Sequence, residues 1–134
     1  MAFRVPGAPV RELFSTDDKT RLCYTQRVRS KEGVPFGHYQ SWSRGFDRTL
    51  TKRKLEKHSR LELFRMYDIE IARVEQSLSA VGASPEVAEA LNIRSGTPML
   101  RLNRFSYDGA GQLVDQLIAL YNPDLFRYHM ETVL

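Results

Sequence analysis

Two arginines with one residue between them, Arg27 and Arg29, are the clearest candidates for chemistry in the sequence. They fall in the run LCYTQRVRSK, Leu22 to Lys31, whose composition predicts a β-strand. Because side chains alternate along a strand, both arginines point to the same face. Each guanidinium can offer a bidentate fork to a phosphate or carboxylate, although an exposed cross-strand ion pair would use the same residues. The pair is therefore a candidate anion site.

A serine, Ser59, begins the run SRLELFRMY, in which apolar side chains recur at helical spacing. Glu62 follows three residues later, so the pattern predicts a short helix with a capping box. The serine hydroxyl and the free N–H groups at the start of such a helix can hold an oxyanion. The alternative interpretation is that Ser59 serves only as the N-cap of the helix. The two roles are compatible.

A hairpin from Arg104 to Tyr121, RFSYDGAGQLVDQLIALY, carries two polar candidates among apolar residues. Asp115 lies in its second arm, and Tyr121 follows six residues later. Positions an even number apart on a strand share a face, so both side chains can line one pocket wall. An equally good interpretation is that Tyr121 packs in the core with its hydroxyl hydrogen-bonded inside the protein.

A sheet has to position these candidates. Alternating or β-branched runs predict strands at residues 10–15, 22–31, 36–43, 69–82, 99–108 and 112–121, and a short last strand around 126–134. A second helix is predicted with Ser84 as N-cap, Pro85 at its first position and Asn92 near its end. Adjacent strands, short connections and helices grouped in mid-chain indicate an α+β fold: an antiparallel β-sheet with helices on one face.

Length and composition limit the class of protein. With 134 residues, 42% of them hydrophobic, the chain is expected to form one domain with its own core. No stretch approaches the roughly 18 apolar residues of a membrane helix, and no secretion signal is visible, so we expect a cytoplasmic protein that does not enter membranes. Cys23 is the only cysteine, and His38, His58 and His129 are far apart, so no disulfide, metal or other cofactor is expected.

Positive charge is concentrated in one segment. Between Arg44 and Arg65 there are eight basic residues and three acids, a local balance of +5 in a chain whose net charge is +4. Such a patch can meet a nucleic-acid backbone or an anionic ligand, and it is also typical of a solvated surface. The segment carries no helix-turn-helix, zinc-finger or RNA-binding signature.

The order of motifs resembles the UTRA domain, the effector-binding half of GntR/HutC-type bacterial transcription regulators. The segments that carry the resemblance are QRVRSKEGVPFGHYQSW, HSRLELFRMYDIEI, VEQSLSAVGASPEVAEALNIRSGTPMLRLNR and YDGAGQLVDQLIALYNPDLFRYHM. The resemblance implies a chorismate-lyase-like fold that binds a small metabolite. In these regulators a winged helix-turn-helix normally precedes the domain and contacts DNA. Nothing of that length precedes Val10, so we expect residues 1–9 to be a tail or linker remnant and the DNA-binding domain to be absent from this chain.

The resemblance also assigns roles to single residues. Arg27 and Arg29 match an R-x-R pair that grips the anion in phosphate-binding members, and Ser59 matches the serine that opens the short helix. Asp115 stands where many relatives carry a glutamate that bonds ligand hydroxyl or amine groups, and Tyr121 matches a tyrosine of the family.

Two positions depart from the family pattern. Tyr39 stands where sugar-phosphate-binding relatives often have a glutamate, and Leu61 where they have a tyrosine, which argues against an amino-sugar phosphate. We expect instead a small anionic metabolite, bearing phosphate, phosphonate or carboxylate, with an apolar body or an amine. Its binding would favour one geometry of a homodimer and so change the spacing of attached DNA-binding domains. The predicted ligand-binding residues are Arg27, Arg29, Tyr39, Ser59, Asp115 and Tyr121.

Two other functions stay open. A chorismate-lyase-type enzyme would place Arg27, Arg29 and Asp115 around an enol-pyruvyl substrate, but no nucleophile–base pair is readable and the regulator motifs match more closely. Direct nucleic-acid binding would use the basic segment from Arg44 to Arg65. We therefore expect a sensor domain without catalytic residues, in contact with DNA only through a winged-helix domain.

Overall fold

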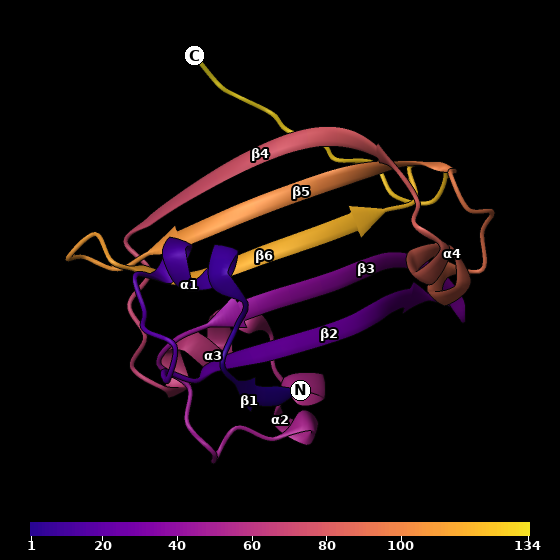
Figure 1. The fold of residues 1–134 in the computed structure, drawn as a ribbon. Coiled ribbons are helices and arrows are strands. Elements are labelled where there is room, and N and C mark those ends of the chain that lie inside the picture. The colour runs from indigo at the N-terminus through magenta and orange to yellow at the C-terminus, as the bar shows by residue number, and fades with distance from the viewer.

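Six antiparallel strands form one sheet in the order β1-β2-β3-β6-β5-β4 in the computed structural model, which describes residues 1–134 (Figure 1). The strands are β1 (Ala2–Arg4), β2 (Leu22–Lys31), β3 (Val34–Ser43), β4 (Arg73–Gly82), β5 (Pro98–Tyr107) and β6 (Leu113–Tyr121). The helices are α1 (Ala8–Phe14), α2 (Lys52–Lys57), α3 (Arg60–Met66) and α4 (Pro85–Leu91). This confirms the α+β class and the antiparallel sheet. None of the helices is long and apolar enough to cross a membrane.

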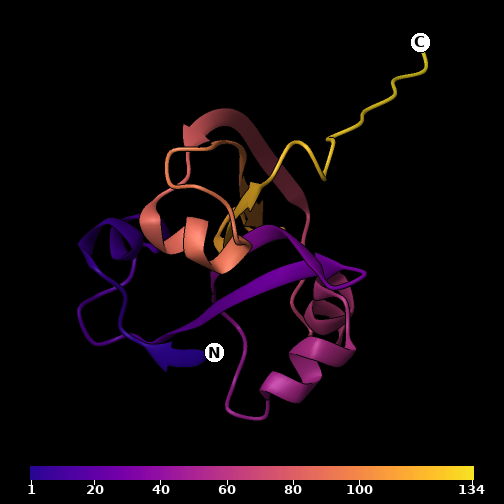
Figure 2. The same cartoon turned by 90° about the vertical axis from the view of Figure 1, so that its right-hand side faces the viewer.

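The helices lie on both faces of the sheet rather than on the one face expected from the sequence. On one face, Phe14 of α1 packs against Leu22, and α4 packs against Met99. On the other face, Leu63 of α3 packs against Cys23. Viewed along the sheet, α1 and α4 are on one side of it, and α2 and α3 are on the other (Figure 2). Both faces carry apolar side chains, so both faces need a cover.

Strand register brings the predicted site residues onto the same face. Arg27 lies opposite Tyr39 and Arg29 lies opposite Gly37 in the β2–β3 pair. Gly37 lies opposite Tyr121 in the β3–β6 pair. Since directly opposed residues on antiparallel strands point to the same side, these side chains share the face that α2 and α3 cover.

The strand expected at residues 10–15 is wrong, because this segment is the helix α1. Val10 and Phe14 are four residues apart, a spacing that places two side chains on the same side of a strand and also on the same side of a helix. Pro9 in the first helical turn decides between the two, since proline fits there without losing a hydrogen bond. Phe14 is then buried, 1% exposed, against the sheet.

Two short elements were not expected from the sequence. Residues 1–9, expected to be a tail, contain β1, in which Phe3 pairs with Cys23 of β2. The helix α2 has a very basic sequence and buries none of its residues, so no apolar stripe signals it. Thr51 caps it by accepting a hydrogen bond from the Lys54 N–H at 3.2 Å.

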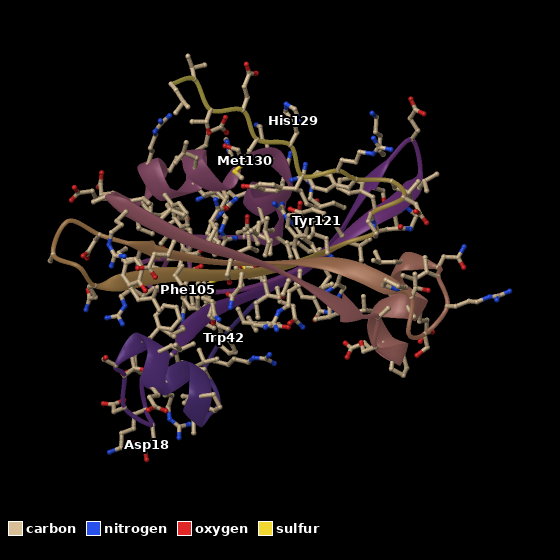
Figure 3. All side chains as sticks on the ribbon, turned by 90° about the horizontal axis from the view of Figure 1, so that it is seen from above. Asp18, Trp42, Phe105, Tyr121, His129 and Met130 are labelled. Atoms are coloured by element: carbon tan, nitrogen blue, oxygen red, sulfur yellow. The ribbon has the colours of Figure 1, made fainter.

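The strand expected around residues 126–134 is also wrong, because the chain has no regular structure there. Phe126 instead turns back onto the sheet and stacks on Tyr121, with ring centroids 4.0 Å apart. From above, Tyr121 lies on the side where the C-terminal segment with His129 runs, whereas Trp42 lies toward α1 (Figure 3).

Both predicted helix caps are confirmed. The Ser59 hydroxyl accepts from the Glu62 N–H, and the Glu62 carboxylate accepts from the Ser59 N–H, which completes the capping box of α3. Ser84 caps α4 in the same way through the Val87 N–H, and Asn92 ends that helix in the left-handed conformation.

Candidate anion-binding site

A cavity of about 500 Å³ opens between the β2–β3 hairpin and the junction of α2 with α3. The sheet forms its floor, and the junction, residues 56–60, forms one rim. Five of the six predicted site residues line it together: Arg27, Arg29, Tyr39, Ser59 and Tyr121.

The two arginines have no acidic partner. Neither Arg27 nor Arg29 is within salt-bridge distance of a carboxylate, and Arg27 donates only to the Leu55 carbonyl, at 3.3 Å. Both guanidinium carbons are close to the ring of Tyr39, at 5.9 and 5.6 Å from its centroid. Burial lowers the pKa of Arg27, and the positive charges of Arg29 and Arg60 lower it further. An anion bound here would therefore relieve repulsion among like charges.

Two tyrosines form an apolar wall with a polar tip. The hydroxyls of Tyr39 and Tyr121 are 2.9 Å apart, and their rings meet edge to face with centroids 5.6 Å apart. Burial and then the hydrogen bond with Tyr39 raise the pKa of Tyr121, so its phenol stays neutral. Gly37 makes this wall possible, because a Cβ at that position would lie 2.9 Å from Cε1 of Tyr39.

Ser59 faces the cavity while it caps α3. Its oxygen accepts from the Glu62 N–H at 3.2 Å, so that helix N–H is already satisfied. The hydroxyl proton of Ser59 is not used by the cap and remains available to a ligand. The role that the structure leaves to Ser59 is that of a side-chain donor, and the helix backbone contributes less than the sequence suggested.

Asp115 does not line the cavity, in contrast to the sequence-based expectation. Its side chain is 1% exposed and forms a buried ion pair with Arg60. The carboxylate accepts from Arg60 Nε at 3.2 Å, from Arg60 Nη2 and from Ser43 Oγ at 2.5 Å. Three hydrogen bonds from the protein thus engage the carboxylate, so a role as a ligand contact or as the acid of a chorismate-lyase-type reaction would compete with this pair.

Arg104 is a cavity residue that sequence reasoning missed. It reaches the cavity from β5, with its Nε donating to Gln76 Oε1 at 2.9 Å and with no acidic partner. The alternation of β5 is readable, but the neighbourhood of Arg104 depends on the strand order, which places β6 between β3 and β5. The cavity is lined by several basic side chains and one carboxylate, that of Glu56; the basic residues are Arg27, Arg29, Lys57, Arg60 and Arg104.

The basic segment from Arg44 to Arg65 is partly turned inward. Arg44 donates to the Phe14 carbonyl, and Arg60 is held by Asp115. Two of the eight basic side chains are thus engaged inside the protein, which weakens the case for a continuous nucleic-acid surface. No three His, Cys, Asp or Glu side chains gather closely enough to hold a metal ion.

The sequence of the chain matches a known family. The match to the UTRA domain covers residues 2–127. The chain belongs to the UTRA domain family. A solved structure with a similar fold is the ligand-binding domain of a GntR-family transcriptional regulator from Bordetella bronchiseptica, with 26% identity and a TM-score of 0.84 over 99% of this chain and 83% of that one.

Two further proteins are similar to this UTRA domain. The effector domain of PhnF from Mycobacterium smegmatis shares the fold at 19% identity, with a TM-score of 0.80 over 99% of this chain and 83% of that one. The HTH-type transcriptional regulator Rv0792c from Mycobacterium tuberculosis is 31% identical over 64 residues, 48% of this chain and 24% of that protein. The match therefore spans about a quarter of that regulator. The Bordetella bronchiseptica and Mycobacterium tuberculosis proteins are both named as transcriptional regulators.

Proposed function

We propose that this UTRA domain is the sensor of a GntR-type transcription regulator and that its cavity binds a small anionic metabolite. The observation that carries the proposal is the pair Arg27 and Arg29, two guanidinium groups without acidic partners at the edge of a cavity of about 500 Å³. Arg27 is half-buried, and a partly desolvated charge is costly unless a counter-charge completes it.

The position of the cavity explains how binding can change the protein. One wall belongs to the sheet, and the opposite rim belongs to the α2–α3 junction, so a ligand that contacts Arg27 and Ser59 bridges two separate parts. It favours the conformations in which these parts are close, which is a population shift. In a homodimer this shift changes the spacing of the attached winged-helix domains and hence their affinity for DNA.

The proposal is tested by calorimetric titration with inorganic phosphate, phenylphosphonate and benzoate. Replacing Arg27 with alanine removes a charged donor from the cavity, so we expect binding of the anions to weaken roughly tenfold or more. Arg53→Ala is the matched control, since Arg53 is an exposed residue of α2 outside the cavity and its loss changes the net charge equally.

The two variants separate cavity binding from surface attraction. If Arg27→Ala and Arg53→Ala weaken binding to the same extent, the anions are attracted by the general charge and the proposed site is wrong. Binding that survives in Arg53→Ala and is lost in Arg27→Ala supports the site.

A further inference from the structure

Unpaired positive charge lies on two sides of the cavity floor. Arg27 and Arg29 come from β2, and Arg104 comes from β5, with β3 and β6 between them. At about 4.8 Å per strand spacing, the backbones of β2 and β5 are roughly 14 Å apart. The side chains enter the cavity from these two edges of its floor, Arg27 and Arg29 from one and Arg104 from the other.

The floor between these two edges is uncharged. Leu117 and Tyr121 of β6 and Tyr39 of β3 line it. Tyr121 lies within the influence of both ends, because the positive charges of Arg104 and Arg29 each act to lower its pKa against the dominant effect of burial. At the centre of the cavity, a ligand would therefore contact aromatic and aliphatic side chains and the hydroxyl groups of Tyr39 and Tyr121.

The cavity lacks a carboxylate that can accept from ligand hydroxyl groups on this floor. Asp115, the acid of β6, is enclosed and bonded to Arg60 and Ser43. Glu56 is the remaining acid of the lining, and it is an exposed residue of α2 at the rim. A polyhydroxylated body would therefore leave its donors without strong acceptors.

We propose that the ligand carries two separated acid groups joined by an uncharged body with few hydroxyls, such as an aromatic or aliphatic compound with a carboxylate at one end and a carboxylate or phosphonate at the other. One acid group binds Arg27 and Arg29, and the second binds Arg104. The inference rests on the proposed sensor function and specifies the class of its effector.

A matched pair of probes tests the second subsite: phenylphosphonate, and 4-carboxyphenylphosphonate, which adds a second acid to the same ring. A series of aliphatic dicarboxylates from glutarate to suberate, each compared with its monocarboxylate, covers other distances. We expect the best two-acid probe to bind the wild-type protein about tenfold more tightly than its one-acid partner, the gain typical of one charged hydrogen-bonded contact.

Replacement of Arg104 with glutamine should remove this advantage, so that the two-acid probe loses about tenfold in affinity and its one-acid partner loses clearly less. Arg101→Gln is the control, because Arg101 lies on the same strand but on the opposite face, opposite Leu120, which packs near α4. It should leave both affinities unchanged.

The outcomes separate the two proposals. If no two-acid probe binds better than its partner, or if Arg104→Gln weakens both equally, the two-subsite inference is refuted while a one-acid site at Arg27 can still stand. If Arg27→Ala changes the binding of neither probe, the proposed function itself fails and the inference with it.

Discussion

Removal of the Asp115 carboxylate is expected to destabilise the whole fold. The side chain is 1% exposed and its partner Arg60 is 20% exposed, so the Asp115→Ala variant leaves a largely buried guanidinium without its counter-charge. Ser43 loses the acceptor of its hydroxyl at the same time. The pair also ties the start of α3 to β6, so its loss weakens the attachment of a helix to the sheet.

The size of the effect follows from the burial of the pair. Breaking a buried ion pair by removing one partner costs about 3–5 kcal/mol. Arg60 keeps some access to water, so we expect a value near the lower end, about 3 kcal/mol. For a chain of this length that loss lowers the melting temperature by roughly 10 °C.

Urea unfolding, followed by the fluorescence of the single tryptophan Trp42, measures the change. The control is Glu75→Ala, which breaks the exposed ion pair between Arg73 and Glu75, whose side chains are 53% and 57% exposed. An exposed pair contributes at most about 1 kcal/mol, so this variant should unfold almost like the wild type.

A double-mutant cycle completes the test. Arg60→Ala, Asp115→Ala and the double variant should show a coupling of more than about 1 kcal/mol, as expected of residues in direct contact. If Asp115→Ala is as stable as Glu75→Ala and instead loses only anion binding, then Asp115 is a ligand residue and the reasoning from the buried pair is wrong.

Three further predictions concern buried groups. Burial lowers the pKa of His38 in the folded protein, so below about pH 6.5 the unfolded chain protonates this histidine more readily and the stability of the fold falls. In urea unfolding, the His38→Gln variant should lose less stability than the wild type between pH 7.5 and 5.5. An unchanged pH dependence in this variant would contradict the prediction. Burial raises the pKa of Cys23 to about 11, so little reactive thiolate forms at pH 8 in the folded protein. Iodoacetamide at pH 8 should therefore modify Cys23 at least about a hundredfold more slowly in the folded protein than in the urea-unfolded chain. Rapid labelling of the folded protein would refute this prediction. The Gly37→Ala variant should lose about 1–3 kcal/mol in free energy of unfolding and bind phenylphosphonate more weakly, because the Cβ of the alanine would displace the Tyr39 ring. Normal affinity in calorimetry would show that binding does not need the tyrosine wall.

Much of the sheet was predictable because its strands carry local signals. β2, β3, β5 and β6 were expected close to their observed positions, since alternation and glycine turns depend only on neighbouring residues. The common face of Arg27 and Arg29 follows from the same alternation. α4 was equally clear, since Ser84 and Pro85 mark its start.

Most of the parts that failed depend on contacts distant in sequence, whereas α1 failed for a local reason. α1 was mistaken for a strand because the spacing of Val10 and Phe14 fits both structures. The inclusion of Arg104 in the cavity follows from β6 pairing with both β3 and β5, which no local pattern specifies. The pair of Asp115 with Arg60 joins residues 55 positions apart.

The misplacement of Asp115 also shows why a position in a family motif does not by itself carry a role. The resemblance assigned Asp115 to the ligand, but the function of a carboxylate depends on which cation is nearest, and here that cation is Arg60 of the same chain. With this acid neutralised inside the protein, Glu56 alone opposes Arg27, Arg29, Lys57 and Arg104 around the cavity. The proposed two-acid ligand would supply the balancing charge, with one acid group at the edge that carries Arg27 and Arg29 and the other at the edge that carries Arg104.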